Sequence, residues 1–146
     1  MPIHRARVSL KREAALVARR IILRDEKLVY VLVANKKLNY STGRSAIVYI
    51  GTTKNGGSRI AASVAGRAKR ILGLHGVTEF SARTLACRPR QRVKMWRKLE
   101  RAMLIGFKEL FGQIPECNVQ GKNFRETDEF RYFARARIHR IIEDLS

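Results

Sequence analysis

Two short runs of apolar residues, many of them β-branched, predict two strands at positions 28–33 and 46–50. The first run is apolar throughout, so we expect both of its faces to be buried. Residues 35–44, between the runs, are polar and rich in turn-forming types, and this favours an antiparallel hairpin. A third strand is expected within residues 77–87, and Pro89 ends it.

Apolar residues at helical spacing predict four helices. Ser58 is expected to cap the second helix and Thr127 the last one. The third helix has the strongest helical period in the chain, and Gly112 follows it as a stop signal. The four predicted ranges are 8–23, 58–72, 92–111 and 127–145.

The predicted order of elements is helix, strand, strand, helix, strand, helix, helix. This order is typical of an α+β fold, in which a small antiparallel three-stranded sheet is flanked by helices and has extra helices at its N- and C-terminal ends. A chain of 146 residues has room for one domain. We therefore expect a basic helical extension over residues 1–26, a central domain over 27–124, and a C-terminal helix over 125–146 that packs on the same domain.

The chain carries 31 Lys and Arg against 12 Asp and Glu, a formal charge of +19. Its hydrophobic content of 45% is too high for a disordered basic tail. Thirteen basic and two acidic residues lie within positions 52–101, whereas positions 126–146 hold four basic and five acidic ones. The middle of the chain is therefore the expected surface for a polyanion, and nucleic acid is the simplest such partner.

Cysteine usage and targeting signals add little. Cys87 and Cys117 are far apart and have no His at ligand spacing, so a structural zinc site is not expected, while a single disulfide stays open. No apolar run has the length needed to cross a bilayer, and we expect no membrane association. Residues 1–24 hold seven Arg or Lys and one acid, which resembles an organelle transit peptide, but a basic amphipathic helix is favoured. We expect a cytoplasmic or nucleoid-associated protein.

Several short motifs occur together over about residues 27–120. The segment Tyr49-Ile50-Gly51-Thr52-Thr53-Lys54-Asn55 is followed by Arg59, eight positions after the glycine, and Leu28-Val29-Tyr30 precedes it. Further along are Trp96-Arg97-Lys98-Leu99-Glu100 within a predicted helix, and Ile114-Pro115-Glu116-Cys117-Asn118-Val119. This succession resembles the catalytic domain of the GIY-YIG nuclease superfamily, with Leu28-Val29-Tyr30 in place of the first triplet and a Pro-x-x-Asn segment that closes the core.

The resemblance implies a site of four catalytic side chains with two supporting residues. Tyr30 would deprotonate the attacking water, Tyr49 would lie on the adjacent strand, and Arg59 would stabilise the developing phosphate charge. Glu100 would hold one divalent ion, Mg²⁺ or Mn²⁺. Gly51 would let the backbone pass close to a phosphate, and Asn118 would fix a loop or a neighbouring side chain.

Physical chemistry agrees with parts of this assignment. A carboxylate on the apolar face of a helix, as predicted for Glu100, is costly unless a metal, an arginine or several donors satisfy it. The alternatives are a buried Glu–Arg pair or a glutamate turned to the rim. A tyrosine with a pKa near 10 is a poor base unless nearby cations depress that pKa, which this basic surface and a metal could do.

The chain departs from the family pattern in three ways. The first triplet lacks its glycine and isoleucine, and eighteen residues separate the two triplets, which implies a longer hairpin. Ser63 stands one turn after Arg59, where many members carry His or Tyr, and serine is not a base at neutral pH without help. Lys54, Tyr40 and His75 are candidates for the missing proton-handling group.

These observations favour a metal-dependent endonuclease that hydrolyses phosphodiester bonds of nucleic acid, with DNA the favoured substrate and RNA the alternative. The alternative is a catalytically inactive, basic nucleic-acid-binding subunit of a nucleoprotein complex, for example one associated with the ribosome. A weaker third hypothesis is binding of the N-terminal helix to a membrane surface. Because the domain is small, its specificity is expected to come from a homodimer or a protein partner. The residues expected to bind nucleic acid are Lys54, Arg67, Lys69, Arg70, Arg88, Arg90, Arg92, Lys94 and Arg97.

Overall fold

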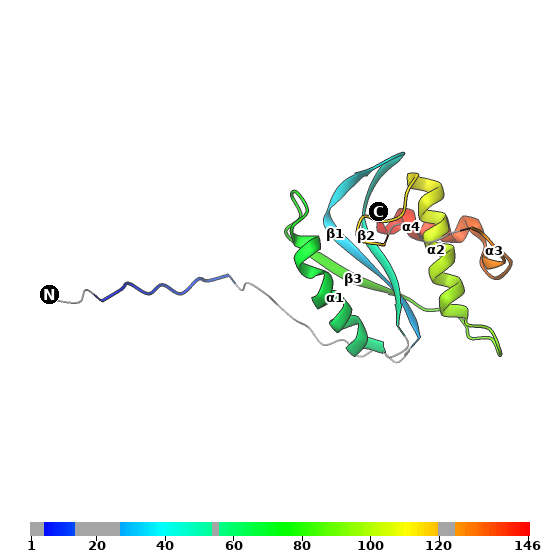
Figure 1. Ribbon diagram of the computed structural model, residues 1–146, viewed down its shortest axis with the longest axis horizontal. Coiled ribbons are helices and arrows are strands. Elements are labelled where there is room, and N and C mark those ends of the chain that lie inside the picture. The colour runs from blue at the N-terminus through cyan, green and yellow to red at the C-terminus, as the bar shows by residue number, and fades with distance from the viewer. Residues whose placement is uncertain (1–4, 14–26, 54–55, 120–124) are drawn as a thin grey trace.

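A computed structural model of the chain describes residues 5–13, 27–53, 56–119 and 125–146. Within these ranges, three strands form one open antiparallel sheet and four helices accompany it, which confirms the predicted α+β class (Figure 1). The elements are β1 (Leu28–Tyr40), β2 (Gly43–Thr53), α1 (Gly56–Leu72), β3 (Phe80–Leu85), α2 (Met95–Phe111), α3 (Glu129–Tyr132) and α4 (Arg135–Leu145).

The β1–β2 hairpin is longer than the two apolar runs that predicted it. Both strands continue through polar residues to a two-residue turn, Ser41-Thr42, so the predicted antiparallel hairpin is confirmed, and its strand pairing extends into residues 35–44. The end of α2 holds this turn in place: the Thr42 N–H donates to the Phe111 carbonyl oxygen at 3.1 Å, and the Ser41 hydroxyl donates to Gln113 Oε1 at 2.8 Å. Hydrogen bonds to distant residues thus stabilise strand structure in a segment whose polar residues do not by themselves favour it.

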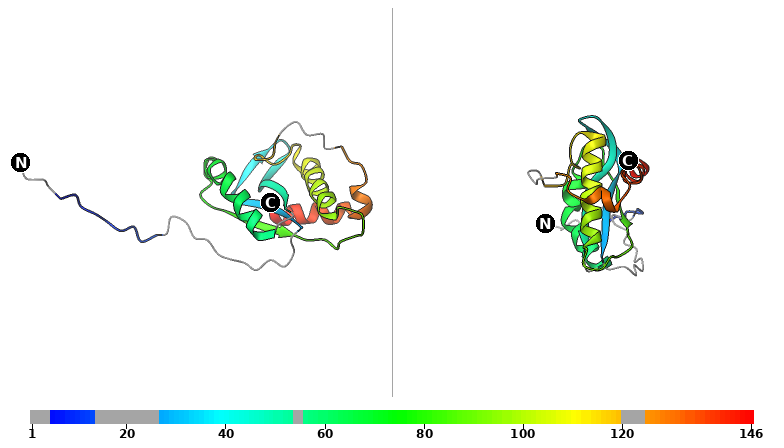
Figure 2. Two further views of the ribbon diagram at one scale, coloured as in Figure 1. Left: turned by 60° about the horizontal axis from the view of Figure 1, so that its bottom comes forward. Right: turned by 90° about the vertical axis from the view of Figure 1, so that its right-hand side faces the viewer.

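β1 is the central strand, because the sheet order is β2-β1-β3. Leu28 to Leu32 are all buried, as their continuous apolar run predicted. Helices cover both faces of the sheet: α1 lies on one side, and α2 with α4 lies on the other (Figures 1 and 2). Alternate residues of β1 therefore enter two separate apolar clusters, Val29 and Val31 beneath α2, and Tyr30 and Leu32 beneath α1.

The two long helices agree with the predicted ones apart from their starts. α1 begins at Gly56, so Ser58 lies inside its first turn and is not its cap. α2 begins at Met95 rather than Arg92, because residues 90–93 form a tight turn of their own. Its end agrees with the sequence signal: Gly112 adopts a left-handed φ of 77°, and its N–H donates to the Lys108 carbonyl oxygen.

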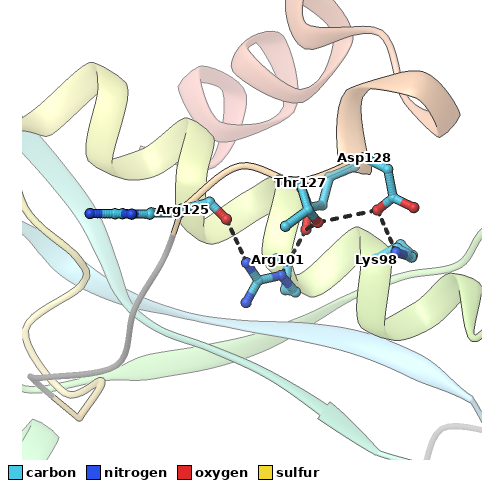
Figure 3. A network of polar contacts seen from close by, with 6 residues as sticks. Lys98, Arg101, Arg125, Thr127 and Asp128 are labelled. Carbon is cyan, nitrogen blue, oxygen red and sulfur yellow. Dashed lines mark hydrogen bonds and ion pairs between the residues drawn. The ribbon is translucent and has the colours of Figure 1, made fainter.

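The predicted C-terminal helix is two helices, because Phe133 and Ala134 are in extended conformation between α3 and α4. A polar network fixes this region to α2 (Figure 3). At its centre the fully buried Glu129 carboxylate accepts from Arg101 Nε at 2.7 Å and from the Thr127 backbone N–H at 2.8 Å. Next to it, Lys98 forms an ion pair with Asp128.

The predicted N-terminal helix finds no support where the structure describes it. Residues 8–13 contain no helix and are exposed, with Leu10 93% accessible, and residues 14–23 lie outside the described residues. In the part of the chain that the structure describes, no helix is long and apolar enough to span a membrane.

Candidate functional site

The tyrosines of the two triplets meet on one face of the sheet. Tyr30 lies opposite Gly51 in the β1–β2 register, and Tyr49 lies opposite Leu32, one step along the same face. Their ring centroids are 5.7 Å apart. Both rings line a hollow of about 620 Å³ between this end of the sheet and α1. The hairpin therefore brings together two hydroxyls whose residues are nineteen positions apart in the sequence.

Gly51 makes room for this pair. A Cβ atom at position 51 would lie 2.6 Å from Tyr49 Cε1 and 2.9 Å from the Tyr30 hydroxyl oxygen. Neither ring can retreat easily, because Tyr30 is buried and Tyr49 is partly buried beneath α1. The need for glycine here thus follows from the two aromatic rings that cover it.

Helix α1 supplies the cationic wall of the hollow. Arg59, Ser63, Arg67 and Arg70 lie four, four and three positions apart, so they share one helical face. The described lining of the hollow contains these three arginines and no carboxylate. Arg59 is exposed near the start of the helix. An anion is the natural occupant of such a site.

A hydrogen-bond network joins the tyrosines to the helix. Arg67 donates through one terminal nitrogen to the Tyr49 hydroxyl at 2.8 Å and through the other to Ser63 Oγ at 2.6 Å. The Ser63 hydroxyl in turn forms a hydrogen bond with the Tyr30 hydroxyl. The Arg67 guanidinium also lies over the Tyr49 ring, 3.9 Å from its centroid. Ser63 therefore connects Tyr30 to a permanent cation.

The environment of Tyr49 keeps its hydroxyl protonated. Burial has the largest effect on the pKa of Tyr49 and raises it, and the Tyr30 charge raises it further. The Arg67 charge lowers this pKa, but the net result is a value of about 12. The arginines around the hollow therefore do not bring the pKa of Tyr49 below its ordinary value. At neutral pH this hydroxyl serves as a hydrogen-bonding group and not as a base.

Glu100 does not line the hollow. It is half-buried on α2, which packs on the opposite face of the sheet from α1. Its charge nevertheless contributes to the raised pKa of Tyr49, so the carboxylate acts on that hydroxyl from beyond the lining. The described residues contain no group of three or more His, Cys, Asp or Glu side chains placed to hold a metal ion.

A single carboxylate is still compatible with magnesium. In proteins Mg²⁺ is commonly held by one or two carboxylates, with waters and substrate phosphate oxygens completing its coordination. The resemblance assigns such an ion to Glu100, which lies outside the described lining of the hollow.

Asn118 fixes the loop that closes the hollow. Its side chain accepts from the Ile50 N–H at 3.0 Å and donates to the Ile50 carbonyl oxygen at 2.9 Å. The neighbouring Cys117 N–H donates to the Val48 carbonyl oxygen at 2.9 Å. The Pro-x-x-Asn segment is thereby attached to the free edge of β2, next to Tyr49. Cys117 and Cys87 are both free thiols.

Two of the three candidates for an additional proton-handling group, Tyr40 and His75, do not line the hollow. Tyr40 is a core residue whose hydroxyl donates to the Ile47 carbonyl oxygen at 2.6 Å, and burial raises its pKa to about 12. His75 lines a separate, smaller hollow with Lys36. Lys54 lies outside the described residues.

The remaining basic residues proposed for nucleic-acid contact fall into two groups. Arg67 and Arg70 line the hollow, and Arg70 also donates to the Glu116 carbonyl oxygen at 2.9 Å. Lys69 is exposed on the same helix. The others are exposed around the β3–α2 loop and the first turn of α2, namely Arg88, Arg90, Arg92, Lys94 and Arg97.

Sequence reasoning missed two features of this site and its support. It treated Arg67 as one phosphate-binding residue among many, although the i, i+4 spacing from Ser63 could have indicated a side-chain contact. It also placed the costly carboxylate at Glu100, whereas the fully buried one is Glu129, paired with Arg101. No local signal marks Glu129, because its burial depends on how α3 folds back on α2.

Comparisons with protein-family models, with curated proteins and with solved structures found no match to this chain. The resemblance to the GIY-YIG nucleases therefore rests on the sequence motifs alone.

Proposed function

We propose that this protein is a metal-dependent endonuclease of the GIY-YIG type, acting on phosphodiester bonds of nucleic acid, with DNA the favoured substrate. The observation that carries the proposal is the meeting of Tyr30, Tyr49 and Arg59 on one hollow that is lined by arginines. These residues come from two strands and a helix, in the order of the family motif, and Arg59 follows Gly51 at the spacing of that motif, although the two triplets are further apart. A scissile phosphate is an anion of suitable charge for this site.

Each side chain has a role that its chemistry permits. Arg59, exposed and always charged, binds the phosphate oxygens that gain charge during cleavage. Tyr30, in its deprotonated form, takes the proton of the attacking water while the water oxygen bonds to phosphorus, the bond from phosphorus to the leaving oxygen breaks, and that oxygen takes a proton from solvent. The hydrogen bond to Ser63 holds the Tyr30 oxygen in place. Tyr49 remains protonated and donates or orients within the site. Glu100, which lies outside the described lining of the hollow, would hold the divalent ion, Mg²⁺ or Mn²⁺, and the ion would neutralise charge on a bound phosphate.

The proposal is tested by incubating the purified full chain with supercoiled plasmid and Mg²⁺ or Mn²⁺. We expect nicked and linear products, and Glu100→Gln is expected to lower the cleavage rate by about 10³-fold while DNA affinity stays within a few-fold. Glu143→Gln, a change at an exposed site on α4, is the matched control and should cut as the wild type does. Cleavage that persists in EDTA or in Glu100→Gln would exclude the metal role.

A second candidate function is non-catalytic binding of nucleic acid, as a basic subunit of a nucleoprotein complex. Two observations favour it: Glu100 is not part of the hollow, and both tyrosine hydroxyls already have partners within the protein. In that case no divalent ion produces cleavage of DNA or RNA, while affinity stays high and falls steeply with salt. The plasmid assay therefore separates the two candidates.

A further inference from the structure

A tight turn precedes helix α2. Arg90 and Val93 pair as an isolated antiparallel bridge, in which the Val93 N–H donates to the Arg90 carbonyl oxygen at 3.3 Å. Gln91 and Arg92 form the tip of the turn and are exposed. The loop that contains this turn extends beyond the lower end of α2 in Figure 1.

The backbone at the tip is unfavourable for the residue that occupies it. Arg92 has a φ of 62° and is the one non-glycine residue with positive φ in the part of the chain that the structure describes. Side chains with a Cβ adopt this left-handed conformation at a cost in free energy, and glycine or asparagine is usual there. For the stability of the turn alone, glycine would be the better residue. The arginine therefore needs another explanation, and one is found in its surroundings.

The turn is the centre of a segment with charges of one sign. From Phe80 to Lys98 the chain has seven basic residues and no acidic one, namely Arg83, Arg88, Arg90, Arg92, Lys94, Arg97 and Lys98. Two of them attach the segment to the protein. Arg90 Cζ lies 5.3 Å from the centroid of the Tyr132 ring on α3, and Lys98 pairs with Asp128. Arg88, Arg92 and Lys94 are exposed and have no ion pair among the described residues.

We propose that this turn, residues 88–94, is a dedicated contact element for the phosphates of a nucleic-acid duplex, separate from the hollow. None of its residues lines the hollow. A short bridged turn, attached through Arg90 and Lys98, presents several basic groups with little loss of freedom on binding, which favours affinity. The inference depends on the nucleic-acid partner of the proposed function but not on cleavage.

The test uses the full chain and three single variants. Arg92→Gln removes the charge and keeps a side chain in the left-handed conformation, whereas Arg92→Gly removes both the charge and the strain. Arg140→Gln, at an exposed site on α4, removes the same charge elsewhere. Affinity for a labelled DNA duplex, and separately for an RNA duplex, is measured by fluorescence anisotropy over a range of salt concentrations. Thermal unfolding is measured on the same samples.

We expect both Arg92 variants to bind the duplex about five- to tenfold more weakly and to reduce the slope of log affinity against log salt by about 1. Arg140→Gln is expected to bind within about twofold of the wild type. Arg92→Gly alone is expected to raise the thermal midpoint, by about 3 °C. Comparison of the loss in affinity for the DNA duplex with that for the RNA duplex identifies which duplex the turn prefers.

Other results would overturn the proposal. If both Arg92 variants bound with wild-type affinity, Arg92 would make no contact with the duplex. If Arg140→Gln lost as much affinity as they do, the loss would come from the lower net charge of the protein and not from the turn. Competition by polyglutamate as effective as that by duplex would assign the turn to an acidic protein instead. An unchanged midpoint in Arg92→Gly would contradict the strain argument. If no variant cleaves plasmid but the affinity differences remain, the nuclease proposal fails while this one stands.

Discussion

At the scale of single residues, the site depends on two requirements that the hairpin imposes. Position 51 must have no Cβ, because Tyr30 and Tyr49 fill the space above it. Arg67 must have two donors in a fixed geometry, because it serves the Tyr49 and Ser63 hydroxyls at once.

Replacement of Gly51 by alanine should destabilise the protein. The new methyl group would overlap the Tyr49 ring and the Tyr30 hydroxyl, and displacing these side chains is expected to lower the free energy of unfolding by about 2 kcal/mol. Gly66→Ala is the matched control, since a Cβ there meets no atom within 4 Å and its helical position favours alanine by about 0.5–1 kcal/mol. Urea unfolding of both variants provides the measurement. Equal stability of the two would show that the tyrosine rings do not constrain position 51.

Replacement of Arg67 by methionine should cost about 2 kcal/mol in urea unfolding, because two partly buried hydroxyls lose a charged donor. Arg67→Lys is expected to recover less than half of this loss, since one ammonium cannot reproduce the forked geometry. Arg70→Met, which loses one exposed hydrogen bond to a carbonyl oxygen, serves as the comparison and should cost less than about 1 kcal/mol. If Arg67→Met and Arg70→Met proved equally stable, the hydrogen bonds of Arg67 would contribute no more to stability than the single hydrogen bond of Arg70.

At the scale of elements, the buried carboxylate of Glu129 attaches α3 to α2. Burial alone would raise the pKa of Glu129, but hydrogen bonds from Arg101 and Thr127 outweigh it, and the pKa falls to about 2. The unfolded chain binds this proton near pH 4.5, so the folded state loses stability as the pH falls from about 5 towards 2. The neighbouring Asp128, whose pKa is lowered chiefly by its hydrogen bond with Lys98, acts in the same direction.

In Glu129→Gln, the free energy of unfolding should therefore depend less on pH below about pH 5 than it does in the wild type. The pKa difference corresponds to at most about 3 kcal/mol at pH 7, which the wild type loses on acidification and the variant lacks from the start. Urea unfolding at pH 7, 5 and 3 gives the comparison, with the exposed Glu143→Gln as control. Parallel pH profiles for wild type and Glu129→Gln would refute the role of this carboxylate.

At the scale of the whole molecule, charge dominates. A formal charge of +19 on 146 residues opposes compaction and favours binding to polyanions. The described hollow, helix α1 and the β3–α2 loop all carry exposed basic residues, while five of the 12 acidic residues of the chain lie within residues 126–146, in or next to α3 and α4.

Binding to DNA is therefore expected to be strongly salt-dependent. If about six phosphates are neutralised, affinity should fall by about 10³-fold between 50 and 200 mM salt. Anisotropy titrations at four salt concentrations measure the slope. Binding that is insensitive to salt would exclude phosphate contact as its main source and would remove the basis shared by both proposed functions.

Much of the fold follows from the sequence because the relevant signals are local. The apolar runs at residues 28–33 and 46–50, the periodicity of α2 and its glycine stop depend on neighbouring positions, and they predicted the hairpin and the long helix. The presence of Tyr30, Tyr49 and Arg59 on one hollow accords with their motif spacing. Net charge likewise needs no structure.

Tertiary structure decided what depends on distant contacts. The polar segment after residue 34 is a strand because the end of α2 holds the hairpin turn by hydrogen bonds. The C-terminal segment forms two helices, since Phe133 and Ala134 are extended between α3 and α4. Glu129, with no sequence signal, became the buried carboxylate, while Glu100 lies on the helix across the sheet from the hollow. The reason is physical: periodicity determines which face of an element is apolar, but partners across elements are set by register and packing.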